Sequence, residues 1–129
     1  MKPASPGGSA KAGSAHESLI RRFTTALQRD DPLELQCLIV EVALESTERE
    51  WAEWACAQLA KHRNANVRGN ALVGFGHLAR RFGRLDPNRV KPLIEIALHA
   101  HNEHVREQAE SAADDVNTFL SWRVERASG

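Results

Sequence analysis

The sequence predicts an all-α protein, a short α-solenoid of about three antiparallel helical hairpins. Apolar residues recur at spacings of three and four through most of the chain, which is the pattern of helices that bury one face. The segment 64–68, Asn-Ala-Asn-Val-Arg, has a counterpart 38 positions later at 102–106, Asn-Glu-His-Val-Arg, and each copy lies between two such stretches. A unit of this length cannot bury its apolar face alone, so the units must stack on one another.

The first hairpin is expected over residues 16–46, after an N-terminal tail at 1–15. The tail contains no large apolar residue except Met1, so it cannot bury enough surface to offset the entropy of ordering, and we expect it to be flexible. A helix over 16–29 should end at an Asp-Asp-Pro turn, because Pro32 suits the first turn of the next helix. That second helix is apolar on most of its circumference, which predicts contacts on two sides.

The second hairpin is expected over residues 47–83. Thr47 and Glu50 have the spacing of a capping box at the start of its first helix. The predicted core stripe of that helix comprises Trp51, Trp54, Ala55, Gln58 and Leu59. The helix after the Asn turn should end at Gly83 in a left-handed cap. Gly74 and Gly76 inside it cost about 1 kcal/mol each relative to alanine, which predicts that another helix or a partner approaches this face closely.

The third hairpin is expected over residues 86–123, with Asp86 as the cap and Pro87 in the first turn of its first helix. Its second helix, from about residue 103 to 122, places four carboxylates on one face: Glu103, Glu107, Glu110 and Asp114. This stripe is typical either of the solvated end of a repeat array or of an acidic docking face. The repeat domain therefore spans 16–123, and we expect residues 124–129 to form a flexible C-terminus.

Composition narrows the classes of function. Cys37 and Cys56 both stand in apolar helical contexts, which predicts two buried, reduced thiols. The chain has no run of eighteen apolar residues, so we expect a cytoplasmic protein with no membrane contact. We find no nucleophile with a partnered base, no facing pair of carboxylates and no metal-ligand spacing among the histidines at 99, 101 and 104. The sequence therefore predicts no enzymatic activity, no cofactor and no metal.

The balance of 17 basic and 17 acidic residues hides separate charged blocks. Residues 30–53 contain eight acidic and one basic residue, 61–91 contain eight basic and one acidic, and 95–115 contain six acidic and one basic. Part of this pattern lets neighbouring repeats attract each other. The central basic stripe leaves open a nucleic-acid-binding accessory protein, although the acidic blocks on both sides would repel a long duplex. Its residues are Lys61, Arg63, Arg80, Arg81, Arg84 and Arg89.

The turn followed by Val-Arg and then by Ala-x3-Phe or Ala-x3-Ala resembles the HEAT repeat, over about residues 47–122. The resemblance implies that Arg68 and Arg106 tie repeat units together. It also implies that the second helices, near residues 32–46, 65–83 and 103–122, line one concave face on which proteins dock.

The run Gly-His-Leu-Ala-Arg at 76–80, together with Glu110, Asp114, Asp115 and Phe119, is similar to small stand-alone bacterial HEAT-repeat proteins. Some proteins of this kind serve as immunity proteins in polymorphic-toxin and contact-dependent growth inhibition systems. The resemblance implies a protein-binding module, favoured as a monomer, and most specifically an immunity protein that neutralises a cognate bacterial toxin. A scaffold or adaptor subunit of an enzyme complex remains an alternative.

Ten residues are candidates for contact with a partner protein: Trp51, Trp54, Asn70, His77, Arg80, Arg81, Arg84, Glu107, Glu110 and Asp115. Trp is a favoured interface residue, but the spacing of Trp51 and Trp54 fits core packing equally well. Arg80, Arg81 and Arg84 end a helix, where positive charge complements the helix dipole, and arginine also suits partner carboxylates or phosphates. His77 is either a contact residue or a hydrogen-bonded interior histidine.

Overall fold

The computed structural model describes residues 7–125, with side chains from Gly13 onward. It contains six helices: α1 (Gly7–Arg29), α2 (Pro32–Glu45), α3 (Arg49–Leu59), α4 (Ala65–Phe82), α5 (Pro87–Ala97) and α6 (Glu103–Leu120). No strand occurs between residues 7 and 125, so the all-α prediction is confirmed. Within the same part of the chain, no helix combines the length and the apolar character needed to cross a membrane.

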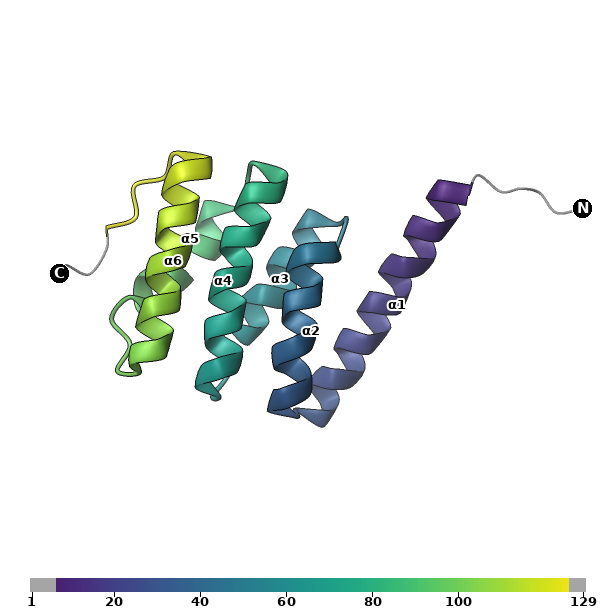
Figure 1. The fold of residues 1–129 in the computed structure, drawn as a ribbon, viewed down its shortest axis with the longest axis horizontal. Coiled ribbons are helices and arrows are strands. Elements are labelled where there is room, and N and C mark those ends of the chain that lie inside the picture. The colour runs from purple at the N-terminus through teal and green to yellow at the C-terminus, as the bar shows by residue number, and fades with distance from the viewer. Residues whose placement is uncertain (1–6, 126–129) are drawn as a thin grey trace, which may run out of the picture.

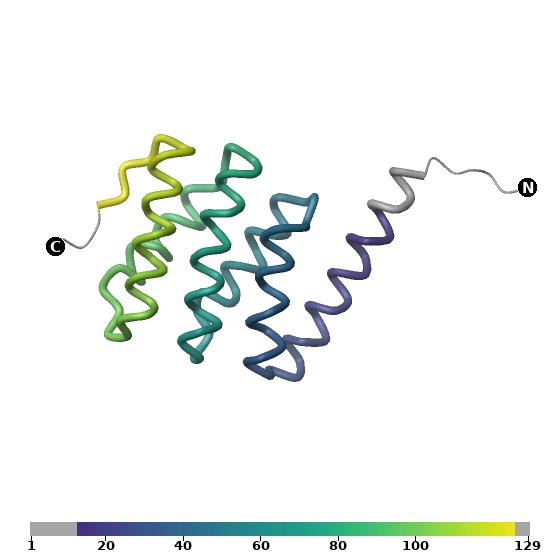
Figure 2. Tube along the Cα trace, in the orientation of Figure 1, coloured from purple at the N-terminus to yellow at the C-terminus, as the bar shows by residue number. Residues whose placement is uncertain are grey.

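Helices α2, α4 and α6 lie side by side in one layer, and α3 and α5 pack behind them in a second layer (Figure 1). Helix α1 lies at the α2 end and diverges from α2 toward its N-terminus, as the trace in Figure 2 shows. One core of buried residues runs through both layers, from Leu19 in α1 to Val116 in α6. We call the surface of the α2, α4 and α6 layer that faces away from α3 and α5 the even-helix face.

The structure moves the start of the first helix. Helix α1 begins at Gly7, so residues 7–15 are helical where a flexible tail was expected. This segment extends a helix that residues 16–29 already nucleate, and adding residues to an existing helix avoids the cost of nucleation. Residues 1–6 of the expected tail lie outside the described part of the chain.

The predicted capping box at the start of the third helix is wrong. Helix α3 has Glu48 as its N-cap, with no hydrogen bond from a capping side chain, and Thr47 precedes it. The Ser46 hydroxyl accepts the backbone N–H of Glu48 at 3.1 Å, and this local turn displaces the helix start from Thr47.

The two Asn turns fold in the same way, as the repeated segment predicts. Asn64 and Asn102 each accept the backbone N–H three residues later, at 3.1 and 3.0 Å. Arg68 and Arg106 each donate two hydrogen bonds, of 2.7 to 3.0 Å, to the carbonyls five and six residues earlier. Carbonyls in such a turn have no partner in the helical ladder, so the arginines satisfy groups of their own hairpin instead of the expected neighbouring repeat.

Helix α4 is the centre of the packing, and its glycines let the neighbouring helices come close. A Cβ at Gly74 would lie 2.8 Å from the Cys56 Sγ of α3, and a Cβ at Gly76 would clash with the Asp115 side chain of α6. Gly83 ends the helix with a φ of 69°. Both the predicted close approach and the predicted left-handed cap are therefore confirmed.

The buried face of α3 differs from the predicted stripe. Ala55 and Leu59 are buried as expected, but Gln58 is exposed and Trp54 is 39% exposed. Glu53 takes part in the buried face with no exposed area at all. A charged residue in the core breaks the apolar pattern, so the buried face extends around the helix to Ala52, Glu53 and Cys56, beyond the predicted stripe.

The Glu53 carboxylate is buried because it has partners from three segments. It forms an ion pair with Arg49 in its own helix, and it lies 3.8 Å from Arg89 of α5. It also accepts the backbone N–H of Asp86 at 3.3 Å. Glu53 thus links α3 to the start of α5 and compensates the loss of its own hydration.

The chain after α6 returns along that helix. Helix α6 ends at Leu120, and Ser121 has a φ of 57°. The Asn117 side chain accepts the N–H of Val124 at 2.9 Å and donates to the carbonyl of Val124 at 3.1 Å. Val124 is buried, so the ordered chain extends into the expected flexible C-terminus, while residues 126–129 lie outside the described part.

Candidate protein-binding surface

The exposed apolar residues of α2 form a stripe along the even-helix face. Leu33, Cys37, Val40 and Leu44, which we call the α2 stripe, follow spacings of four, three and four and therefore share one helical side. Leu33 is 72% exposed, Val40 38% and Leu44 45%. Cys37 is exposed as well, contrary to the expectation of a buried thiol, and it borders the cleft between α1 and α2.

Helix α4 supplies the middle of the even-helix face. Asn70 donates a hydrogen bond of 3.2 Å to a backbone carbonyl of α2. Partial burial lowers the pKa of His77, and the nearby Arg80 adds to the shift. Arg80 pairs with Asp115 of α6 at 3.3 Å and lies over the Phe119 ring, 5.6 Å from its centroid. Of the predicted contact residues on this face, Asn70, Arg80 and Asp115 already contact other elements of the protein itself.

Helix α6 gives the third part of the face an acidic character. Its four carboxylates, Glu103, Glu107, Glu110 and Asp114, lie opposite its buried positions. Glu103 and Glu107 are exposed, and Glu110 is half-buried. Arg106, the one basic residue of α6, donates to turn carbonyls. The even-helix face therefore changes from apolar at α2, through polar at α4, to acidic at α6.

The predicted basic stripe divides into two groups at the ends of α4, Lys61 with Arg63 and Arg80 with Arg81 and Arg84, and Arg89 lies apart from both in α5. These groups are about 27 Å apart, the length of an 18-residue helix. Arg63 pairs with Asp30 at 2.5 Å. Arg81 donates hydrogen bonds of 2.9 and 2.8 Å to two carbonyls at the C-terminal end of α2, groups that a helix end leaves unpaired. Arg84 is exposed. The basic residues therefore do not form one continuous surface.

Trp51 and Trp54 lie on α3, in the other layer. The Phe23 ring of α1 packs edge-on against both, with centroid distances of 5.6 and 5.9 Å. His16 contacts Trp51 in the same manner at 5.5 Å. Of the two alternatives for these residues, core packing or a partner interface, Trp51 packs against the core. Trp54 packs against Phe23 and is 39% exposed. Neither residue contributes to the even-helix face.

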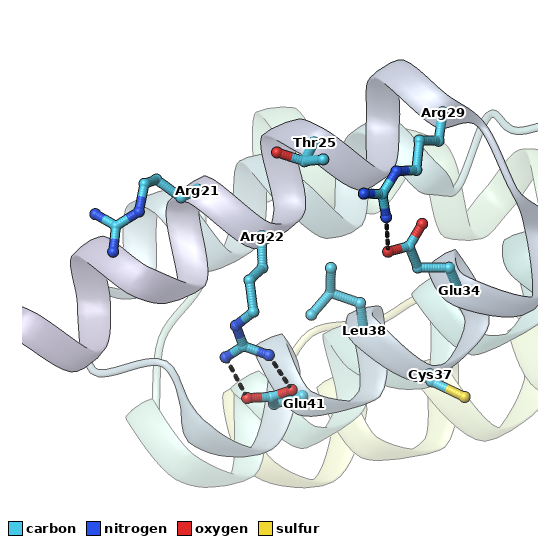
Figure 3. Close-up of a pocket in the computed structure, with 8 residues that line it drawn as sticks. All are labelled: Arg21, Arg22, Thr25, Arg29, Glu34, Cys37, Leu38 and Glu41. Atoms are coloured by element: carbon cyan, nitrogen blue, oxygen red, sulfur yellow. Dashed lines mark hydrogen bonds and ion pairs between the residues drawn. The ribbon is translucent and has the colours of Figure 1, made fainter.

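A cleft of about 620 Å³ separates α1 from α2. Figure 3 shows its lining residues, Arg21, Arg22, Thr25 and Arg29 from α1 and Glu34, Cys37, Leu38 and Glu41 from α2. Arg22 forms two hydrogen bonds to Glu41, of 2.9 and 2.7 Å, which lower the pKa of the Glu41 carboxyl. Arg29 pairs with Glu34 at 3.0 Å. Exposed pairs contribute about 1 kcal/mol at most, so the apolar contacts of α1 hold it in place.

The described side chains offer little for metal or thiol chemistry. Between residues 13 and 125, no group of three or more His, Cys, Asp or Glu side chains is arranged to hold a metal ion. Cys56 is fully buried, and this burial, with the charge of Glu53, raises the pKa of its thiol. A thiol with a raised pKa carries little of the reactive thiolate, so Cys56 is a packing residue.

Comparisons of the chain with protein-family models, curated proteins and solved structures found no match. The HEAT resemblance of residues 47–122 therefore remains a prediction. The geometry of the even-helix face is the basis for a functional proposal.

The α2 stripe is the part of this surface that sequence reasoning missed. The sequence showed that α2 is apolar on most of its circumference and predicted contacts on two sides. The 33-37-40-44 spacing is a second apolar face, on the side of the helix opposite the buried one at 35, 38, 39 and 42. This spacing was the available signal, but only the position of α2 in the layer reveals which of the two faces is covered.

Proposed function

We propose that the chain is a protein-binding module, a short HEAT-like solenoid of three hairpins that docks a partner protein on its even-helix face. The α2 stripe carries this proposal, because its three large apolar side chains are 38% to 72% exposed on one helical side. Contiguous exposed apolar surface is typical of protein interaction sites. The matching caps and arginines of the two Asn turns support the repeat architecture.

The most specific form of the proposal is an immunity protein. It rests on the resemblance of the run at 76–80, with Glu110, Asp114, Asp115 and Phe119, to small bacterial HEAT-repeat proteins. In this form the chain is a cytoplasmic monomer that binds a cognate toxin and occludes the active surface of the toxin. A scaffold or adaptor subunit would use the same face, but its partner would be an enzyme that is harmless without it.

Two substitutions of matched exposure test the face. Leu33 on α2 is 72% exposed and Ile96 on α5, in the other layer, is 70% exposed. The tagged full-length chain captures its partner from the native host, and the purified partner is titrated against the wild type, Leu33→Ser and Ile96→Ser. We expect Leu33→Ser to weaken binding about tenfold, as loss of an apolar anchor does, and Ile96→Ser to leave it unchanged. The reverse pattern would contradict the proposal.

The immunity form has its own test. The captured partner is expressed in a heterologous host with and without the chain. We expect growth arrest that the wild-type chain relieves and that Leu33→Ser relieves poorly. A partner that is harmless when expressed alone would rule out the immunity form and leave the protein-binding module standing.

The nucleic-acid-binding alternative has less support from the surface. Its basic residues lie at opposite ends of α4 and on α5, and Arg63 and Arg81 are engaged within the protein. Binding to an oligonucleotide that falls steeply with added salt would nevertheless favour it.

A further inference from the structure

The gradient of charge across the even-helix face specifies the chemistry of a partner. The α2 stripe is apolar at one edge, and the exposed carboxylates of Glu103 and Glu107 stand at the other. We propose that this face binds a basic amphipathic helix, which places apolar side chains on the α2 stripe and Lys or Arg side chains on α6. The inference rests on the proposed function and specifies the partner that the face accepts.

The dimensions of the layer suit a single helix lying along α4. Neighbouring packed helices are about 8–10 Å apart, so α2 and α6 are about 16–20 Å apart across α4. A helix with its side chains is about 10–12 Å wide, and the long side chains of Lys and Arg extend its reach further. One helix above α4 therefore contacts both edges of the face.

The middle of the face offers an apolar contact where α4 packs closely against α6. Gly69 and Gly76 of α4 carry no side chains, and the spaces beside them are filled by His104 and Asp115 of α6. Val73, half-buried between these glycines, adds an apolar contact at the centre. A helix lying along α4 would therefore meet the apolar side chain of Val73 between the α2 stripe and the carboxylates of α6.

The same charges disfavour other partners. An acidic segment would meet the carboxylates of Glu103 and Glu107 across the face, and like charges in contact repel. Arg80, the basic residue nearest to the middle of the face, is already paired with Asp115. A purely apolar segment that covered the whole face would strip water from the two glutamates without providing a donor, which is unfavourable.

Designed peptides test the charge preference directly. The probe is a fluorescent peptide of about 20 residues, long enough to form a helix, with Leu on one side and Lys on the adjacent side. A second peptide replaces every Lys with Glu, and a third scrambles the first so that its helical periodicity is lost. Fluorescence anisotropy with the full-length chain is measured at about 50 and about 300 mM salt. We expect the basic amphipathic peptide to bind at least about tenfold more tightly than both others, with a smaller advantage over the Glu peptide at high salt.

Variants of the chain locate the binding. Glu103→Gln with Glu107→Gln should weaken binding of the basic peptide about fivefold, and Leu44→Ser should weaken it by a similar factor. Glu95→Gln and Ile96→Ser on α5 are the matched controls and should leave binding unchanged. Thermal unfolding of every variant verifies that it is folded. Failure of the basic peptide to bind, equal binding of the Lys and Glu peptides, or no response to the double glutamine variant would overturn the inference.

These outcomes are separate from the test of the proposed function. A native partner whose binding depends on Leu33, combined with peptides that show no charge preference, would leave the protein-binding module standing and overturn the basic helix. A native partner that ignores Leu33 and responds to Ile96 would instead overturn the docking face itself.

Discussion

Replacing Gly74 with alanine tests how closely α4 packs against its neighbours. The added Cβ would lie 2.8 Å from the Cys56 Sγ and 3.4 Å from the Ala43 Cβ, and both neighbours are fully buried. In an open helix this change stabilises by about 1 kcal/mol, whereas an extra methyl in a filled core costs about 1–3 kcal/mol. We therefore expect Gly74→Ala to lower the free energy of unfolding by up to about 2 kcal/mol.

Urea denaturation followed by circular dichroism measures this change, and the chain offers a matched control. A Cβ at Gly13 in α1 would meet nothing within 4 Å, so Gly13→Ala should be neutral or raise the free energy of unfolding by up to about 1 kcal/mol. Cys56→Ala removes the clashing sulfur, so Gly74→Ala in that background should no longer destabilise. Equal stabilisation by Gly74→Ala and Gly13→Ala in the wild-type background would refute the reasoning.

Three further predictions concern ionisable and turn residues. Hydrogen bonds from His62 and Arg63 lower the pKa of Asp30, so its contribution to stability is present above about pH 4 and is lost as the pH falls further. Urea unfolding measured between about pH 3 and pH 7 should therefore show a smaller decrease in the free energy of unfolding at low pH for Asp30→Asn than for the wild type. Burial lowers the pKa of His77, so the midpoint of its NMR titration should lie below about 6.5. Because the unfolded chain then binds more protons, the free energy of unfolding should fall as the pH drops below about 6.5. A midpoint above about 6.5 would be inconsistent with the burial of the ring. Arg106→Ala removes two hydrogen bonds to turn carbonyls and should cost about 1–3 kcal/mol in thermal unfolding, whereas exposed Arg123→Ala should change stability by less than about 0.5 kcal/mol.

The parts of the fold that the sequence predicted best are those where local signals agree. Helix α4 has a capping Asn64, a continuous apolar period and a terminal Gly83, and all three act within a few residues of the chain. Thr47 shows the opposite case, because its capping-box spacing was correct but the Ser46 hydroxyl formed a competing turn. A cap that depends on one nearby residue can therefore be predicted from the sequence, whereas the outcome when two adjacent residues compete to form a cap or turn cannot.

The sequence alone did not predict which charged residues make internal contacts. Glu53 is buried because Arg89 and the Asp86 N–H, more than 30 positions away in the sequence, join Arg49 of its own helix around the carboxylate, and only the folded chain brings them together. Arg81 illustrates the same limit, since its hydrogen bonds to the end of α2 join residues 35 and 38 positions apart. Residue type alone therefore predicted a surface contact where the structure has an internal one.

The candidate surface was predictable only in outline. The expectation that the second helices share a face placed Asn70, His77 and Glu107 correctly in one layer. The exposed Leu33 and Leu44 were not distinguished from core residues, because both apolar sides of α2 have helical spacing. Which side is covered depends on the neighbours of α2, and these are set by the stacking of helices distant in the sequence.

Binding of a partner on the even-helix face should involve the α2 stripe directly. Methyl NMR spectra of the full-length chain, labelled at Leu, Val and Ile and recorded with and without the captured partner, follow Leu33, Val40, Leu44 and Ile96 in one experiment. We expect the three α2 signals to shift on binding and the Ile96 signal to stay in place. Shifts at Ile96 with unchanged signals from Leu33 and Leu44 would contradict this expectation.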